Sequence, residues 1–119
     1  MAREKRTTLI AGVVEGIEGD DEHFYNASVV FGPDGEIIGR YDKVRRVPFG
    51  EFVPVRSLLE GLVGDALPSK DAIAGEDPST VDTPAGRMGI VISWEVFFGD
   101  RGRDAVNGRG RPTTLLLEV

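Results

Sequence analysis

Residues 41–54, which read YDKVRRVPFGEFVP, constrain the fold more than any other stretch of this sequence. Proline has no backbone N–H and its ring restricts φ, so Pro48 and Pro54 exclude a continuous helix or a central strand here. We therefore expect an ordered loop. That loop presents two residues of opposite charge, Lys43 and Glu51.

Short apolar runs bounded by turn residues predict strands on both sides of this loop. The expected strands are Leu9–Val14, Ala27–Phe31, Glu36–Tyr41, Val81–Thr83, Arg87–Ile92 and Leu115–Val119. The turn sequences Gly32-Pro33-Asp34-Gly35 and Pro84-Ala85-Gly86 predict two antiparallel hairpins, formed by the second and third strands and by the fourth and fifth.

Helices are expected to be short and few. Leucines at helical spacing predict a helix over Ser57–Val63 capped by Ser57, and a second helix is expected from about Asp100 to Val106. Residues 64–80 read as an exposed loop. With 119 residues, 40% of them apolar, the chain can form one modest domain, and its 16 glycines and 7 prolines disfavour a helix bundle.

Charge and composition exclude several classes of function. A net charge of −6 argues against a general nucleic-acid binder, and acidic residues separate the arginines between residues 101 and 111. The absence of cysteine excludes disulfides and thiolate metal ligands. The acidic residues 20–22 lack the spacing of a calcium loop and are expected in an exposed turn, so no metal site is expected.

Ser93 directly follows the apolar run Met88–Ile92, at an expected turn from strand to helix. A side chain at such a turn is exposed at the end of the sheet, where an acyl carbonyl can reach it. Spacing alone leaves two interpretations open. Ser93 is either a nucleophile or an ordinary turn or helix-capping residue.

Three motifs together resemble a known superfamily: Y-x-K at residue 41, V-P-F-G-E-F-V-P at residue 47, and I-S-W-E-V-F-F at residue 92. They are similar to the carbon-nitrogen hydrolase (nitrilase) superfamily, and the second motif resembles its apolipoprotein N-acyltransferase branch. The likeness runs from about Thr8 to about Val106, so residues 1–119 read as one partial domain with a poorly matched tail at 107–119.

The resemblance implies an α/β fold, part of a four-layer α/β/β/α sandwich truncated at both ends. It also implies catalytic roles. Ser93 would be the nucleophile, Lys43 would stabilise the oxyanion, and Glu51 would orient groups or move protons. The residues alone leave alternatives open, because Lys43 could be a surface lysine and Glu51 a solvated loop residue.

Glu95 is the fourth catalytic candidate, either supporting the loop or interacting with the following helix electrostatically. Trp94 and Phe49 are candidate substrate-binding residues, although Trp94 could equally belong to the core.

The sequence departs from the superfamily in two places. Its members use a Glu-Lys-Cys triad, but Ser93 stands where the cysteine is expected. The general-base glutamate should lie well upstream of Lys43, before the strand that begins near Leu9, and we expect it to be missing together with the N-terminal half of the family's domain. We therefore expect the chain to be a fragment, or a truncated gene product, of such an enzyme. Its sequence is compatible with an active serine enzyme and with an inactive copy.

The parent enzyme implied by the resemblance transfers a fatty acyl group from a phospholipid to the N-terminal diacylglyceryl cysteine of a lipoprotein. It needs no cofactor. It acts in the bacterial cell membrane, with the catalytic domain on the extracytoplasmic face and membrane segments absent from this chain. The alternatives are a soluble amidase or carbamoylase of the same superfamily, and an inactive remnant or non-catalytic binding fragment.

Overall fold

Four strands form the first sheet of the computed structural model, which describes residues 1–63, 67–107, 112 and 114–118. Strands β1 (Leu9–Ile17), β2 (Asp20–Phe31) and β3 (Ile37–Asp42) form an antiparallel meander. Both turns use glycine at positive φ, Gly19 (φ 81°) and Gly35 (φ 86°), a conformation that lacks a steric penalty only for glycine. The short β4 (Asp71–Ala72) adds in parallel to β2.

The second sheet contains the β5–β6 hairpin and one parallel strand. Strands β5 (Thr80–Thr83) and β6 (Gly86–Ile92) pair antiparallel, and β7 (Thr114–Glu118) pairs in parallel with β6. The chain leaves β6 through the 3-10 helix η2 (Ser93–Phe97) and continues into α3 (Gly99–Asn107). A parallel pair needs such a crossover, which a tight turn cannot supply.

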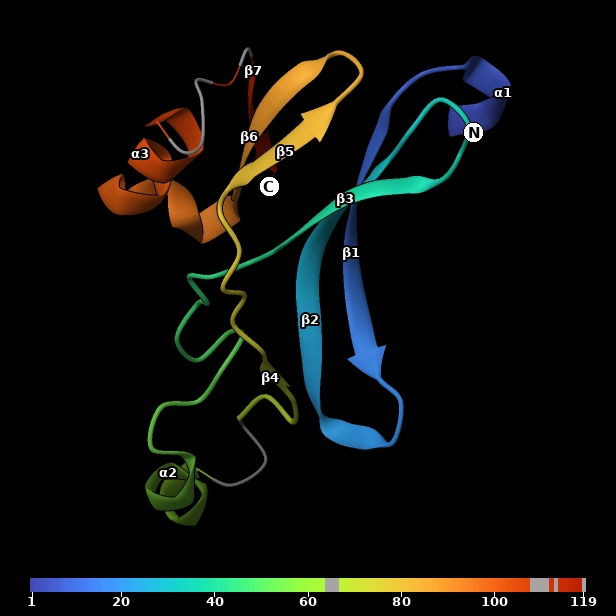
Figure 1. Cartoon of the computed structure of the whole chain (residues 1–119). Coiled ribbons are helices and arrows are strands. Elements are labelled where there is room, and N and C mark those ends of the chain that lie inside the picture. Colours follow the sequence, from blue (N-terminus) through green and yellow to red (C-terminus); the bar gives the residue numbers. More distant parts are fainter. Residues whose placement is uncertain (64–66, 108–111, 113, 119) are drawn as a thin grey trace.

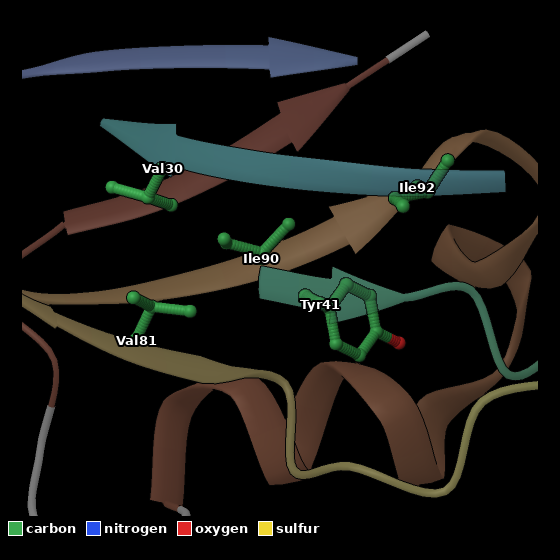
Figure 2. Packing of buried hydrophobic residues seen from close by; sticks show 5 residues of the cluster. All are labelled: Val30, Tyr41, Val81, Ile90 and Ile92. Carbon is green, nitrogen blue, oxygen red and sulfur yellow. The ribbon is translucent and has the colours of Figure 1, made fainter. Parts of the chain in front are cut away.

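The two sheets pack face to face around an apolar core (Figure 2). The first sheet contributes Val30 and Tyr41, and the second contributes Val81, Ile90 and Ile92. Burying each of these side chains contributes about 1.5–3 kcal/mol. This core holds the end of β3 beside the end of β6, which is where the candidate site lies.

Helix α3 lies on the side of the second sheet that faces away from the first (Figure 1). Gly89 in β6 allows this approach, because a Cβ there would overlap the backbone of Ala105 in α3. The remaining helices are α1 (Ala2–Lys5) and α2 (Arg56–Val63). Within the described ranges, no helix is long and apolar enough to span a membrane.

The α/β class, the two packed sheets and both predicted hairpins are confirmed. The helix expected from about residue 100 is confirmed as α3. The last predicted strand is confirmed as β7 for residues 114–118, and its final residue, 119, lies outside the described residues.

Several boundaries were wrong. Strands β1 and β2 extend well beyond the apolar runs, so residues 20–22 lie in β2 and not in a turn. Backbone pairing continues through this polar hairpin, as in the pair Glu15↔Tyr25, without needing apolar side chains. Helix α2 begins at Arg56, so Ser57 lies within the helix and is not its cap. The expected loop at 64–80 contains β4, while its residues 64–66 and the tail residues 108–111 and 113 lie outside the described residues.

Candidate active site

Lys43 is the first residue after β3, and the backbone of two other segments holds it in place. Its N–H donates to the carbonyl of Asn26 (2.8 Å), and its own carbonyl accepts from the N–H of Gly75 (2.9 Å). The side chain is only 2% exposed. A buried ammonium requires a partner of opposite charge, and Nζ lies 2.7 Å from Oε1 of Glu51.

Glu51 lies in the predicted loop, and hydrogen bonds hold both of its carboxylate oxygens. Oε1 also accepts from Nδ2 of Asn26 (3.0 Å), and Oε2 accepts from the N–H of Val47 (2.8 Å). Within the loop, Phe49 adopts a left-handed φ of 62°. The loop therefore presents a carboxylate whose position is set by an ammonium, an amide and a backbone N–H.

Ser93 follows β6 directly and adopts a left-handed φ of 49°. This conformation costs a residue other than glycine roughly 1–2 kcal/mol. Strained backbone of this kind persists only where the surrounding structure enforces it, and it concentrates at functional sites. The serine side chain is half-buried at the end of the strand.

Glu95 is fully buried and accepts hydrogen bonds from three separate parts of the chain. Its carboxylate accepts from the hydroxyl of Tyr41 (2.9 Å to each oxygen) and from the N–H groups of Val44 (2.8 Å), Arg45 (2.9 Å) and Ile92 (3.0 Å). Glu95 thus joins the loop after β3 to the turn after β6.

Tyr41 links Glu95 to a cation on α3. Burial raises the pKa of the Tyr41 hydroxyl to about 12, so the hydroxyl stays protonated and donates to Glu95. Nη2 of Arg101 donates to the Tyr41 hydroxyl oxygen (3.0 Å) and to Oγ of Ser79 (2.6 Å). The Glu95 carboxylate is therefore linked to the Arg101 guanidinium through two hydrogen bonds, with the Tyr41 hydroxyl between them.

Three of the predicted catalytic residues, Lys43, Glu51 and Ser93, line one cavity of about 300 Å³. Asn26 and Glu118 line it too. This combination can act on an acyl group: a hydroxyl at a strained turn can attack a carbonyl, and a nearby ammonium can stabilise the oxyanion that results.

The other three predicted residues lie outside this cavity. Glu95 is fully buried. Phe49 is 58% exposed in the loop. Trp94 is half-buried and packs edge-on against Phe97 and Phe98, with ring centroids 5.6 and 5.8 Å away.

Sequence reasoning missed three residues of this region: Asn26, Arg101 and Glu118. A signal was available for Glu118, because it is the one acidic residue within the otherwise apolar run at 115–119. A glutamate in a strand usually faces solvent, and one that faces the protein interior needs a partner. Asn26 and Arg101 gave no comparable local signal.

Known proteins resemble this chain along nearly all of its length. The family model described as carbon-nitrogen hydrolase matches residues 1–109. An apolipoprotein N-acyltransferase of Geobacter metallireducens is 34% identical over 121 residues, covering 100% of this chain and 22% of the relative. A chloroplastic omega-amidase of Arabidopsis thaliana is 32% identical over 98 residues, covering 82% of this chain and 24% of the relative. The chain thus spans only about a fifth to a quarter of these relatives.

Solved structures share the fold at lower identity. A carbon-nitrogen hydrolase from Helicobacter pylori superposes with a TM-score of 0.67 at 20% identity, covering 98% of this chain and 34% of that one. An amidase from Nesterenkonia sp. AN1 superposes with a TM-score of 0.65 at 17% identity, covering 98% of this chain and 38% of that one.

Proposed function

The chain belongs to the carbon-nitrogen hydrolase family, and on this premise we propose that it is the part of an apolipoprotein N-acyltransferase that bears the nucleophile. In this proposal an acyl group passes from a phospholipid to Ser93 and then to the amino terminus of a diacylglyceryl lipoprotein. The parent protein acts at the bacterial cell membrane, with this domain on the extracytoplasmic face. The observation that carries the proposal is the shared cavity of Lys43, Glu51 and Ser93.

Each residue has a role that follows from its contacts. Ser93 Oγ attacks the acyl carbonyl, its left-handed backbone turning the side chain out of β6. Lys43 stabilises the negative charge that forms on the carbonyl oxygen, because its ammonium is desolvated and already held in place. Glu51 orients that ammonium through the 2.7 Å ion pair. Glu95 positions the loop after β3 and the turn after β6 through its hydrogen bonds to Val44 and Ile92.

Serine is a weaker nucleophile than the cysteine of the family, because a hydroxyl needs a base within reach to lose its proton. The proposal therefore predicts slow acylation by the chain as it stands. It also predicts that Ser93→Cys accelerates acylation, since a thiol already carries a useful thiolate fraction near neutral pH.

The test is covalent labelling of the full chain. The chain is incubated with p-nitrophenyl butyrate and analysed by peptide mass spectrometry. A butyryl group on Ser93 is expected. It should be absent from Ser93→Ala, much reduced in Lys43→Met and formed fastest in Ser93→Cys. No labelling at residue 93, in wild type or in Ser93→Cys, would refute the proposed nucleophile and favour an inactive remnant or binding fragment.

A second candidate is an amidase that transfers the acyl group to water. The similarity to an omega-amidase and the polar residues lining the cavity favour it. The two functions differ in the acceptor. Product analysis in the presence of a primary amine separates them, because an amidase gives the free acid and an N-acyltransferase gives the amide.

A further inference from the structure

Glu118, the last residue of β7, reaches across the space between the two sheets. It pairs in register with Ile92, the residue before Ser93, so the two side chains leave the second sheet on the same side. On the opposite sheet, Oγ of the fully buried Ser28 donates a hydrogen bond to Oε2 of Glu118. The Glu118 carboxylate is therefore held between the sheets.

The first sheet has room for this carboxylate because two small residues face it. Gly12 in β1 and Ser28 in β2 are paired in register. A Cβ at position 12 would overlap the carboxylate of Glu118. The glycine and serine thus form a cradle that a larger pair would fill.

The charges in the cavity do not cancel. Lys43 and Glu51 form an ion pair, and the Glu51 carboxylate accepts two further hydrogen bonds, from Asn26 and Val47. Glu118 adds a second carboxylate, and its one hydrogen-bond partner among the described residues is the neutral Ser28. The cavity therefore carries a net charge of about −1 and favours a cation over an anion.

We propose that Glu118 binds the amino group of the acyl acceptor in this cavity and carries one proton during the transfer. The proposal rests on the function proposed above. The acceptor of an N-acyltransferase is a primary amine, which is largely cationic near neutral pH. The Glu118 carboxylate, which lines the same cavity as Ser93, binds that ammonium. The ammonium then loses a proton to solvent and becomes the neutral amine.

The neutral amine nitrogen attacks the carbonyl of the Ser93 ester, forming the C–N bond and making the nitrogen cationic and acidic. One nitrogen proton passes to the Glu118 carboxylate. The C–O bond to Ser93 breaks, and the departing oxygen takes the proton from Glu118. The products are the amide, free Ser93 and ionised Glu118.

The experiment separates acylation from transfer. The full chain is acylated with p-nitrophenyl butyrate, and release of nitrophenol measures the first step. S-glyceryl-cysteine amide is then added, and the ratio of amide to free acid measures the second. The variants are Glu118→Gln, which keeps the shape, and Glu18→Gln, which makes the same charge change in the exposed turn between β1 and β2.

We expect Glu118→Gln to lower the amide-to-acid ratio about tenfold or more relative to wild type, as expected for loss of a charged hydrogen-bond partner. Glu18→Gln should match wild type in both steps. Gly12→Ala, which pushes the carboxylate away, should also lower the ratio. An unchanged ratio in Glu118→Gln would overturn the proposal.

Amine binding to the unacylated chain gives a second test that needs no turnover. Calorimetry compares S-glyceryl-cysteine amide with its N-acetylated, uncharged form. We expect wild type and Glu18→Gln to prefer the free amine and Glu118→Gln to lose that preference. Equal binding of the free amine by wild type and Glu118→Gln would refute the role of Glu118. Failure of Ser93 labelling with amine preference intact would refute only the proposed function.

Discussion

Replacing Glu95 with glutamine tests how firmly the buried carboxylate holds the site together. The change keeps the shape but replaces one oxygen with an amide nitrogen. Oε1 accepts from Tyr41, Val44 and Arg45, so the glutamine oxygen is expected to occupy that position. The new NH₂ group then faces the N–H of Ile92, which loses its acceptor.

Glu95→Gln changes the free energy of unfolding in three ways. A buried N–H left without a partner costs about 1–3 kcal/mol. The three remaining hydrogen bonds change from charged to neutral acceptors, and each weakens by about 1 kcal/mol. Removing the desolvation cost of the carboxylate offsets part of this loss. We therefore expect Glu95→Gln to lower the free energy of unfolding by about 3 kcal/mol.

Urea unfolding measures this loss directly. Trp94 is the only tryptophan, and it adjoins residue 95, so its fluorescence reports on the site. With an m-value of roughly 1–3 kcal/mol/M, the unfolding midpoint should fall by about 1–3 M. Glu22→Gln, an exposed residue of β2, is the matched control and should leave the midpoint unchanged. A Glu95→Gln midpoint equal to that of the control would refute the reasoning.

Three other perturbations test the Lys43–Glu51 ion pair, the buried Tyr41 hydroxyl and the packing of α3. Lys43→Met should lower the free energy of unfolding by about 3–5 kcal/mol, because it leaves the Glu51 carboxylate without its cation. In urea unfolding, the double variant with Glu51→Gln should recover part of that loss. If the losses from the two substitutions simply add, the pairing is contradicted. The raised pKa of Tyr41 means that the folded protein favours the neutral hydroxyl. The contribution of this hydroxyl to the free energy of unfolding is therefore fully present below about pH 10 and should be lost as the pH rises towards 12. Thermal unfolding at stepped pH should show this decline, and Tyr41→Phe should lack it. Gly89→Ala should destabilise the protein by about 1–3 kcal/mol, because the new Cβ overlaps α3. Gly61→Ala in α2, where a Cβ meets nothing within 4 Å, should stabilise it by about 0.5–1 kcal/mol. Equal effects of the two variants on the thermal midpoint would contradict the close packing of α3 on β6.

The part of the site that could be predicted from the sequence is the local part. Lys43 and Glu51 are eight residues apart within one proline-containing loop, so a single motif places both. Ser93 was predictable for the same reason, because a buried strand followed by a turn gives the position of the next side chain. Its left-handed φ was not predictable, since the strain comes from packing around it.

The remainder depends on contacts between distant segments. Two roles were open for Glu95, and its hydrogen bonds to Tyr41, 54 residues away, favour support of the loop. Such a contact joins a strand of the first sheet to the turn that follows the second, so it cannot be predicted without knowing how the sheets pack. Strand β2 was predicted too short because its polar half pairs through the backbone, which leaves no pattern in side-chain hydrophobicity.

The contact between Ser28 and Glu118 also bears on the order in which the protein folds. The two residues are 90 positions apart, and β7 reaches β6 only after η2 and α3 have crossed the second sheet. Closing so large a loop costs more entropy than closing the eight-residue loop between Lys43 and Glu51. During synthesis the ion pair can form while β7 is still inside the ribosome. Glu118 can join the cavity only afterwards, so in a growing chain the ion pair of Lys43 and Glu51 should form before the second carboxylate arrives.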